Sequence, residues 1–410
     1  MRCAPLPSVC LHDGFEKNNP LTRYMLKIQV NMKIDFKTYD PLIDIHIIKN
    51  IWSDLLPKSN QSFFLSTDWI FTWLSTLPKE QKIICVVGCM ANEPILAFFI
   101  GKRKRIRDKL FNSQSLYLNT TGIEYYDELT IEYNSILVSS CINEEIYPLV
   151  WSDTIKFLNT FIKWDKLYIP GATEQMHALC NEMIKIHKDP LHCTVRKNVH
   201  SYYVDFKKVR ANSMDYISLL SSKLRARIRR SIREYEKNGK IRMRRAETIE
   251  EAISMLNGLA ELHQQEWSKR GYPGSFSNKF FFDFHKQLIE NSFENGRIQL
   301  LKLYNDSYTI GYIYNFIYEK KILHYQCGFN YLNNHNMRPG IVSHYLAIIY
   351  NAKMNYNKYD FLAGDYEYKR SLSTGANQMS WLVLQKNRKI FLLDQMIRKN
   401  KKRYKIYRSK

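Results

Sequence analysis

Hydrophobic positions along the chain form two blocks, each of which places helical periodicity before strand alternation. In the first block, the pattern predicts an amphipathic helix within 60–77, with Ser66 or Thr67 as its N-cap. The later elements expected in this block are strands at 82–89, 95–100, 115–118, 135–138, 164–169 and 201–205, and helices at 146–161 and 174–186. The last of these strands is expected to lie at a sheet edge and to close the block.

The second block gives the clearer signals. Thr248 and Glu251 form a T-x-x-E capping box before a helix expected to end near Trp267. The remaining elements expected here are helices at 280–291 and 341–354, strands at 297–304, 309–318, 321–329, 359–363 and 380–385, and a loop at 364–369. This order is mixed α+β and argues against a dinucleotide-binding βαβ domain. The chain also lacks the G-x-G-x-x-G, Walker A, G-x-S-x-G and H-E-x-x-H motifs.

The composition excludes general disorder, and the positive net charge is concentrated in two segments of the chain. The 410 residues are 45% hydrophobic and 14% aromatic, which is enough apolar material for two or three domains. Of the net charge of +22, Lys223–Arg245 carries +9 and Lys386–Lys410 carries +10. The rest of the chain is therefore near neutral, which argues against one long face that tracks DNA. Each basic segment could contact RNA or another anionic surface, although such a run is most often a solvated face.

Cysteine usage indicates a reducing compartment. The eight cysteines are scattered, with no C-x-x-C pair and no Cys/His spacing suited to zinc, so no metal is expected. Single histidines such as His263, His285 and His344 are expected on helix surfaces. The N-terminus lacks a signal-peptide pattern, and the most apolar run, Ile83–Gly101, is interrupted by polar residues and a proline. We therefore expect a cytoplasmic protein without a transmembrane segment.

A polar loop links a strand end to a helix start between His324 and Gly340. Free backbone N–H groups at a helix N-terminus can hold a phosphate, and Arg338 could add a bidentate contact. The alternative is an ordinary helix start with Pro339 in its first turn. Before this loop, Tyr325 and Gln326 alternate on their strand, and a core role is the commoner explanation for such a tyrosine.

The segment 360–369 places carboxylates, phenols and an amine where an apolar strand opens into a loop. Such groups at a strand end commonly line a cleft, where Asp365 could act as a base and a tyrosine as an acid. The alternative is a solvated turn, in which Glu367 and Lys369 only decorate the surface.

Six segments in a fixed order carry a family resemblance. They are LSTDWIFTW (65–73), KLRARIRRSIREYEKNG (223–239), LHQQEWSKRG (262–271), HYQCGF (324–329), RPG (338–340) and YDFLAGDYEYK (359–369). Together they resemble the CelD-type acetyltransferase-like proteins of the GNAT superfamily, which are similar to the Fem-type peptidoglycan aminoacyltransferases.

The resemblance implies two tandem GNAT-like domains, each a mixed, mainly antiparallel sheet flanked by helices. The expected divisions are a weakly structured segment (1–34), an N-terminal GNAT-like domain (35–205), a C-terminal GNAT-like domain with the active site (206–395) and a basic tail (396–410).

Site residues follow from the resemblance by position. The pyrophosphate loop of an acyl-CoA donor corresponds to Met337, Arg338, Gly340 and Ile341, with Gln326 beside it. This loop departs from the superfamily pattern R/Q-x-x-G-x-G/A, since it carries one glycine. The expected catalytic groups are Asp365 as base or acceptor-orienting group, Tyr368 or Tyr325 as proton donor, and Lys369 as a contact for an anionic acceptor or product.

Three functions remain open from the sequence. The leading one is an acyltransferase that moves an acyl group, expected to be acetyl, from acyl-CoA to an amine or hydroxyl of a polysaccharide, cell-envelope or small-molecule acceptor. The second is an aminoacyl-tRNA-dependent Fem-like transferase, with 223–245 and 386–410 holding the tRNA. The interval 240–296 is short for the helical hairpin that such enzymes often carry, which favours CoA. The third is a non-catalytic basic protein that binds nucleic acid or membrane.

Overall fold

The structure is a computed structural model that describes residues 33–59, 62–107 and 111–387. The expected basic tail (396–410) therefore lies outside the described residues, as does the basic segment 386–410 apart from its first two positions. The helices and strands of the N-terminal half are β1 (Asp35–Tyr39), α2 (Ile45–Leu55), α3 (Thr67–Thr76), β2 (Ile83–Met90), β3 (Glu93–Arg107), β4 (Phe111–Leu118), α4 (Glu124–Asp127), β5 (Leu137–Val138), α5 (Tyr147–Phe161), β6 (Lys166–Thr173), α6 (Glu174–Ile186) and β7 (Leu191–Asp205).

The C-terminal half repeats this alternation with longer helices. Its helices and strands are α7 (Phe206–Ala211), α8 (Ser222–Glu236), β8 (Arg242–Arg245), α9 (Ile249–Lys269), α10 (Lys279–Ser292), β9 (Ile298–Tyr304), β10 (Thr309–Tyr318), β11 (Lys321–Phe329), α11 (Pro339–Lys353), β12 (Lys358–Ala363), α12 (Glu367–Leu372) and β13 (Gly375–Lys386). Short 3₁₀ turns at Leu56–Lys58, Phe63–Leu65, Glu144–Ile146, Tyr216–Leu219 and Ser275–Ser277 connect some of these elements.

Local sequence signals explain most of the helix boundaries. Ser66 caps α3 by accepting a hydrogen bond from the Trp69 amide, and Thr248 caps α9 by accepting from the Glu251 amide. These caps satisfy backbone donors that the first helical turn leaves without partners. The predicted capping residues are therefore confirmed at both helices.

The described strands form one continuous mixed sheet with the order β1-β2-β3-β4-β6-β13-β7-β12-β11-β10-β9-β8. Neighbouring strands are antiparallel except for β4 with β6 and β11 with β12. Each parallel pair is hydrogen-bonded over a short stretch and then separates, so each half of the sheet contains one split. This is the arrangement of two tandem GNAT-like folds, and the predicted α+β class is confirmed.

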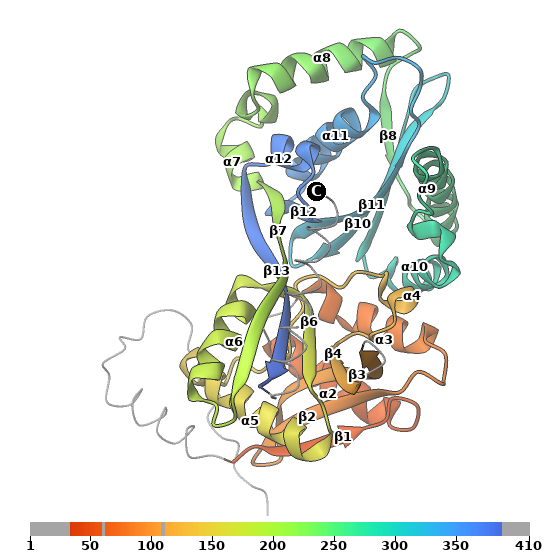
Figure 1. Ribbon diagram of the computed structural model, residues 1–410. Coiled ribbons are helices and arrows are strands. Elements are labelled where there is room, and N and C mark those ends of the chain that lie inside the picture. Colours follow the sequence, from red (N-terminus) through yellow and green to blue (C-terminus); the bar gives the residue numbers. More distant parts are fainter. Residues whose placement is uncertain (1–32, 60–61, 108–110, 388–410) are drawn as a thin grey trace, which may run out of the picture.

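Two long strands join the halves (Figure 1). β13 pairs with β6 over 379–385 and with β7 along its whole length, while the last residues of β7 pair with β12. The chain's final described strand therefore inserts into the N-terminal half of the sheet. The prediction that 201–205 forms an edge strand is wrong, because these residues lie between β13 and β12 in the middle of the sheet.

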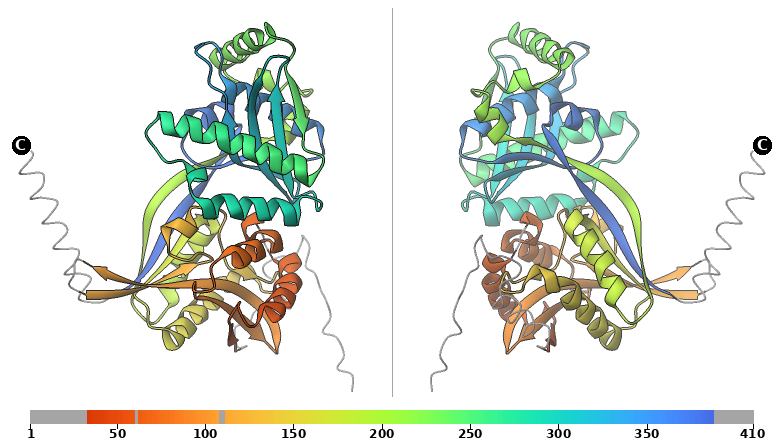
Figure 2. Two further views of the ribbon diagram at one scale, coloured as in Figure 1. Left: turned by 90° about the vertical axis from the view of Figure 1, so that its right-hand side faces the viewer. Right: turned by 90° about the vertical axis from the view of Figure 1, so that its left-hand side faces the viewer.

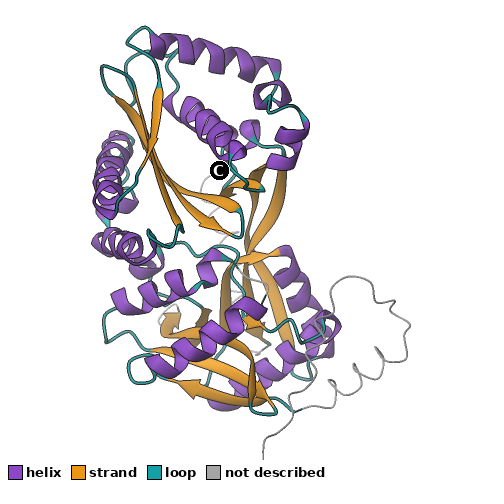
Figure 3. Ribbon diagram, turned by 180° about the vertical axis from the view of Figure 1, so that it is seen from behind, coloured by secondary structure: helices purple, strands orange, loops and turns teal. Residues whose placement is uncertain are grey.

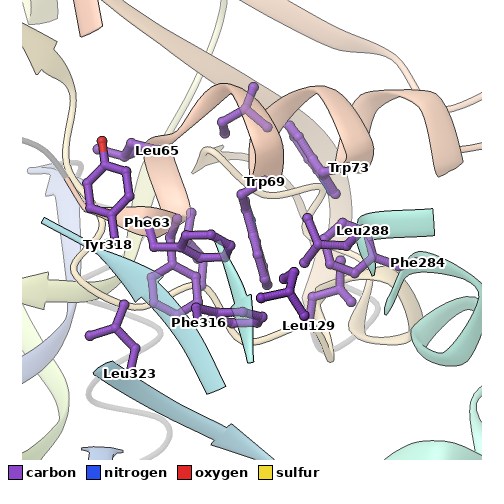
Figure 4. Close-up of a cluster of buried hydrophobic side chains, with 14 of the residues drawn as sticks. Phe63, Leu65, Trp69, Trp73, Leu129, Phe284, Leu288, Phe316, Tyr318 and Leu323 are labelled. Atoms are coloured by element: carbon purple, nitrogen blue, oxygen red, sulfur yellow. The ribbon is translucent and has the colours of Figure 1, made fainter. Parts of the chain in front are cut away.

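Helices cover both faces of the sheet (Figure 3). On one face, α2 and α3 of the N-terminal half lie next to α9 and α10 of the C-terminal half (Figure 2). A single hydrophobic core runs beneath these four helices, and within it Phe63 stacks on Phe316 with ring centroids 4.2 Å apart (Figure 4). The two halves thus share buried apolar surface as well as strands.

The differences from the predicted elements have local causes. Residues 364–369 were expected to form a loop, but α12 begins at Glu367 and packs Leu372 into the core beside β7. The three example histidines lie inside the protein, since His263 is 6% exposed and His285 and His344 are fully buried. Their expected surface positions are wrong because an isolated histidine carries no signal of the face on which it lies.

Candidate active site

The split in the C-terminal half opens into a large cavity. β11 and β12 pair only from Lys321 with Lys358 to Leu323 with Asp360, and beyond this point the strands separate. A cavity of about 1020 Å³ occupies the space between them and extends to the start of α11. This volume suits a substantial organic ligand.

A bulge in β11 places an amide beside this cavity. The register with β10 passes from Gln326 opposite Tyr314 to His324 opposite Asn315, so Tyr325 is the extra residue. A bulge re-aims the strand locally. The Cys327 N–H donates to the side-chain Oε1 of Gln326 at 3.1 Å, and Gln326 and Cys327 both line the cavity.

The N-terminus of α11 forms one end of the cavity. Arg338 is the N-cap residue, Pro339 begins the helix, and no side chain caps this end. Met337, Arg338, Gly340 and Ile341 all line the cavity. The Arg338 N–H donates to Ser231 Oγ of α8 at 2.9 Å, which fixes the loop against the basic helix. The uncapped helix end and the Arg338 guanidinium are suited to an anionic group.

The N-terminal half contributes a buried carboxylate to this site. Glu132 is 6% exposed, lines the cavity, and accepts a 2.7 Å hydrogen bond from the Ala363 N–H at the end of β12. Three non-glycine residues with positive φ surround it: Thr130 (50°), Tyr133 (49°) and Leu362 (59°). Such conformations cost roughly 1–2 kcal/mol each and are retained where the surrounding structure imposes them.

Burial and one lysine set the charge of Glu132. Burial raises the pKa of Glu132 to about 7, while the nearby Lys369 acts in the opposite direction. Burial lowers the pKa of Lys369, and Glu132 is the largest of the charges that oppose this. The Lys369 ammonium donates to the Ala363 carbonyl at 2.8 Å and to the Leu362 carbonyl at 3.3 Å. The carboxyl group can therefore change its protonation state near neutral pH, as a general base must.

Two histidines, a cysteine and a tyrosine form the wall of the cavity on the α11 side. The rings of His324 and His344 lie 4.4 Å apart, and Tyr368 stacks on His344 at 5.2 Å. Burial lowers the pKa of both histidines and raises the pKa of Cys327 to about 12 and that of Tyr368 well above its usual value. All four groups are therefore neutral near pH 7.

Most of the site residues expected from the sequence come together here. Tyr325, Gln326, Met337, Arg338, Gly340, Ile341, Tyr368 and Lys369 line the cavity. Tyr325 is bulged, and its hydroxyl donates to the Leu129 carbonyl at 2.5 Å. Lys369 is 7% exposed and is held by carbonyl groups, rather than being free to meet an anion.

Asp365 is the exception. Its side chain is exposed and does not line the cavity; His200 Nδ1 lies 3.0 Å from its Oδ1, and the Tyr202 hydroxyl donates to the same oxygen at 3.1 Å. Sequence reasoning missed Glu132 because it lies in the other half of the chain and in no recognisable motif. The only local signal was a polar residue between apolar positions, which many strands share.

The corresponding split in the N-terminal half is filled by the chain itself. Asn134 lies between β4 and β6, where its N–H donates to the Gly171 carbonyl at 2.9 Å. Its side chain accepts from Asn119 Nδ2 at 2.8 Å and donates to the Leu118 carbonyl at 3.1 Å. A Cβ atom at Gly171 of β6 would lie 2.3 Å from the Ile131 carbonyl oxygen. The segment that contains Ile131 and Asn134 therefore packs directly against β6. The C-terminal split is therefore the one that can receive a ligand.

Comparison with known families agrees with this location. Residues 222–370 match the model of an acetyltransferase (GNAT) domain. The matched region begins with α8 and ends within α12, so it contains the cavity, the bulged strand and the uncapped helix end. Residues 222–370 of the C-terminal half are thus similar to an acetyltransferase (GNAT) domain.

Solved structures show a similar fold over both halves. FemX matches with a TM-score of 0.54 at 10% identity, over 83% of this chain and 96% of that chain. A tandem GNAT protein from the clavulanic acid biosynthesis pathway matches with a TM-score of 0.45 at 9% identity, over 86% and 98% of the two chains. L-PGS from Bacillus licheniformis matches with a TM-score of 0.45 at 8% identity, over 85% and 94%. No curated protein sequence matches the chain.

Within the described ranges, no helix combines the length and the apolarity needed to cross a membrane.

Proposed function

We propose that the protein is an acyltransferase that moves an acyl group from acyl-CoA to an amine or hydroxyl acceptor, within the CelD-type group of the GNAT superfamily. The observation that carries the proposal is the cavity between β11 and β12, which is lined by an uncapped helix N-terminus, by Cys327, whose N–H donates to the Gln326 side chain, and by a titratable buried carboxylate. These are the three elements that acyl transfer from a phosphate-bearing thioester requires.

The donor would be held at both ends of the cavity. Its pyrophosphate would accept hydrogen bonds from the free N–H groups of Gly340 and Ile341 and from the Arg338 guanidinium. Its thioester would lie beside the β11 bulge, where the carbonyl oxygen would replace Gln326 Oε1 as the acceptor for the Cys327 N–H. This amide would stabilise the negative charge that develops on the oxygen.

Proton transfers would involve both halves of the protein. Glu132 would take a proton from the acceptor as the nitrogen or oxygen attacks the carbonyl carbon, and the C–S bond would then break. Tyr368 would return a proton to the departing thiolate, since its raised pKa keeps the phenol protonated. We assign the base to Glu132 rather than Asp365 because Glu132 lines the cavity and Asp365 does not.

Lys369 would tune the base instead of binding an anionic acceptor. Its ammonium is held by the carbonyl groups at the end of β12 and acts on Glu132 as the largest single charge. The acceptor would enter beside Glu128 and Glu132, and this acidic wall favours an amine over an anion. Polysaccharide, cell-envelope and small-molecule amines are all within this class.

Ligand-induced stabilisation tests the donor. Acetyl-CoA in excess is expected to raise the unfolding temperature, because binding to the native state adds RT ln(1 + [L]/Kd) to its stability. Arg338→Ala is expected to weaken acetyl-CoA binding by about 10-fold, whereas the exposed Arg196→Ala in β7 serves as a charge-matched control and is expected to behave like wild type. Absence of stabilisation by acetyl-CoA and by longer acyl-CoAs would overturn the proposal.

A second donor is favoured by one specific observation. The exposed cations Lys223, Arg229, Arg230 and Arg233 lie on α8, the helix whose Ser231 holds the loop before α11. Aminoacyl-tRNA could bind along this helix with its 3′ end in the cavity. In the same thermal experiment, stabilisation by aminoacyl-tRNA but not by CoA species would favour this donor. Equal stabilisation by any RNA, without acyl transfer, would favour a non-catalytic binding protein.

A further inference from the structure

Three potential metal-binding side chains meet on the α11 side of the cavity. His324 and Cys327 project from β11, and His344 projects from the second turn of α11. One ligand atom from each residue lies within 4.8 Å of the other two. The two histidines are buried, Cys327 is partly exposed, and all three line the cavity.

A chain of buried amides fixes the tautomer of His324. Asn351 Nδ2 donates to the Ala347 carbonyl at 2.9 Å, so Asn351 Oδ1 is left to accept from Gln299 Nε2, also at 2.9 Å. Gln299 Oε1 in turn accepts from Asn315 Nδ2 at 2.8 Å. Asn315 Oδ1 therefore faces His324 Nδ1 at 3.2 Å as an acceptor.

The ring nitrogen Nδ1 of His324 must then carry the proton, and the lone pair lies on Nε2. A histidine that binds a metal through one ring nitrogen usually donates a hydrogen bond from its other ring nitrogen to an acceptor such as this one, which orients the ring.

His344 supplies an independent observation. Its Nδ1 lies 3.3 Å from the Tyr359 hydroxyl, while its Nε2 is fully buried and has no hydrogen-bond partner in the described part of the chain. A buried polar atom without a protein partner is costly and is normally satisfied by a water molecule or an ion. The unpartnered nitrogen belongs to the same cluster as Cys327 and His324.

We propose that His324, Cys327 and His344 bind a divalent transition-metal ion of the zinc class. Two imidazoles and one thiolate are a ligand set that zinc accepts, with bonds of about 2.0–2.3 Å. Tetrahedral geometry with these bonds places ligand atoms roughly 3.3–3.6 Å apart, so the side chains need to close by about 1 Å.

The fourth coordination position would face the cavity, because all three ligands line it. Binding replaces the Cys327 S–H bond with an S–metal bond and releases one proton to solvent. The metal site shares no ligand atom with the groups assigned to acyl transfer, but it lies against them, because Tyr368 stacks on His344 and Cys327 contributes its N–H to the other site. A bound ion would link β11 to α11.

The sequence did not indicate this site because its third ligand comes from a different element. His324 and Cys327 fall on the same face of β11 only because Tyr325 is bulged between them, which changes the alternation of the strand. His344 approaches them through the packing of α11 on the sheet.

Cobalt and zinc binding to the full-length protein tests the proposal. We expect one equivalent of Co²⁺ to give a thiolate-to-metal charge-transfer band, and Zn²⁺ to displace it. Cys327→Ser is expected to abolish the band and His344→Asn to weaken binding at least 100-fold. Asn315→Ala, which removes the support of His324 together with the Asn315 hydrogen bond to Gln299, is expected to weaken it about 10–100-fold. His263→Asn is the matched control, since His263 lines the same cavity outside the cluster.

A second measurement keeps the test valid if a variant fails to fold. In the wild-type protein, Zn²⁺ is expected to protect Cys327 from alkylation while the exposed Cys141 stays reactive, as read by peptide mass spectrometry. The proposal is overturned if no stoichiometric Co²⁺ or Zn²⁺ binding occurs at micromolar metal. It is equally overturned if binding persists in folded Cys327→Ser protein, or if Zn²⁺ leaves alkylation of Cys327 unchanged.

Discussion

The hydroxyl of Tyr133 donates a 2.6 Å hydrogen bond to Oδ2 of Asp360, and 227 residues of sequence separate the two. Ser201 Oγ donates to the other oxygen at 2.8 Å, and the Leu362 N–H donates to it as well at 2.8 Å. Asp360 is 2% exposed and lies where β12 separates from β11. Side chains of the N-terminal half therefore bind Asp360 at the point where the split of the candidate active site begins.

Removing the Tyr133 hydroxyl is expected to destabilise the protein. In Tyr133→Phe, the buried Asp360 carboxylate loses one of its hydrogen bonds, and bonds to charged groups contribute about 1.5–3 kcal/mol. Urea denaturation should show a loss of this size. Tyr272→Phe, at a side chain that is 61% exposed, is expected to change stability by less than about 0.5 kcal/mol. Equal stability of the two variants would contradict the assigned role of Tyr133.

Glu132 is expected to make stability depend on pH. Its folded pKa of about 7 lies above its usual value of 4.5, so the folded state holds this proton more tightly than the unfolded state. The resulting stabilisation is complete below pH 4.5 and is lost as pH rises through 7, with a slope of up to about 1.4 kcal/mol per pH unit.

Glu132→Gln should lack this part of the slope while keeping an acceptor for the Ala363 N–H. Urea denaturation of both proteins at pH 5, 6, 7 and 8 measures the difference. Parallel curves for the two proteins would show that Glu132 does not titrate in this range.

Lys369→Met is expected to raise the pH at which acyl transfer becomes active. The Lys369 charge is the largest influence lowering the pKa of Glu132, so its removal should shift that pKa upward by about 1–3 units. The pH profile of CoA release with an amine acceptor reports the shift. Lys358→Met, at the start of β12 and outside the cavity, is the control and should keep a midpoint near 7. An unchanged midpoint in Lys369→Met would remove the tuning role.

The sequence predicted the elements of the site better than the contacts between them. The strand that carries Tyr325 and the helix that begins after Arg338 follow from local hydrophobic periodicity and from Pro339, so their positions could be predicted. The position of Glu132 depends on how one half of the chain meets the other. Periodicity within a segment carries no information about that contact.

The direction of Asp365 also depends on tertiary structure. Its strand and loop were predicted, yet the left-handed Leu362 and the partners His200 and Tyr202 turn its carboxylate away from the cavity. A bulge or a positive φ at a non-glycine residue leaves no signal in a single sequence. The base was therefore assigned to the nearest carboxylate along the chain instead of the one across the split.

Asn134→Ala is expected to destabilise the N-terminal half without affecting donor binding. The fully buried Asn134 side chain accepts from Asn119 and donates to the Leu118 carbonyl, and its loss leaves both groups without these bonds at a cost of about 1–3 kcal/mol each. The exposed Asn181→Ala in α6 is the control. Urea denaturation and acetyl-CoA titration are the measurements. Weaker acetyl-CoA binding in the folded Asn134→Ala protein would show that the filled split takes part in binding.

The shared strands predict that the two halves unfold together. Leu382 of β13 is 1% exposed and pairs with Ile169 of β6 and Val195 of β7, so a proline at this position removes central ladder contacts and should cost about 3 kcal/mol or more. Because the last residues of β7 pair with β12, the loss of stability should extend to the C-terminal half as well.

Two probes can follow the halves separately. In a Trp267→Phe background, the remaining tryptophans lie in the N-terminal half or in the part of β13 that pairs with it, so their fluorescence reports on that half. Alkylation of Cys327 reports on the C-terminal half. Leu382→Pro should lower both midpoints by the same amount. Lys37→Pro lies on β1, which pairs with β2 alone among the described strands, and should have a smaller effect. A fall in the tryptophan midpoint alone would show that β13 stabilises one half only, and that the halves are thermodynamically separate despite their continuous sheet.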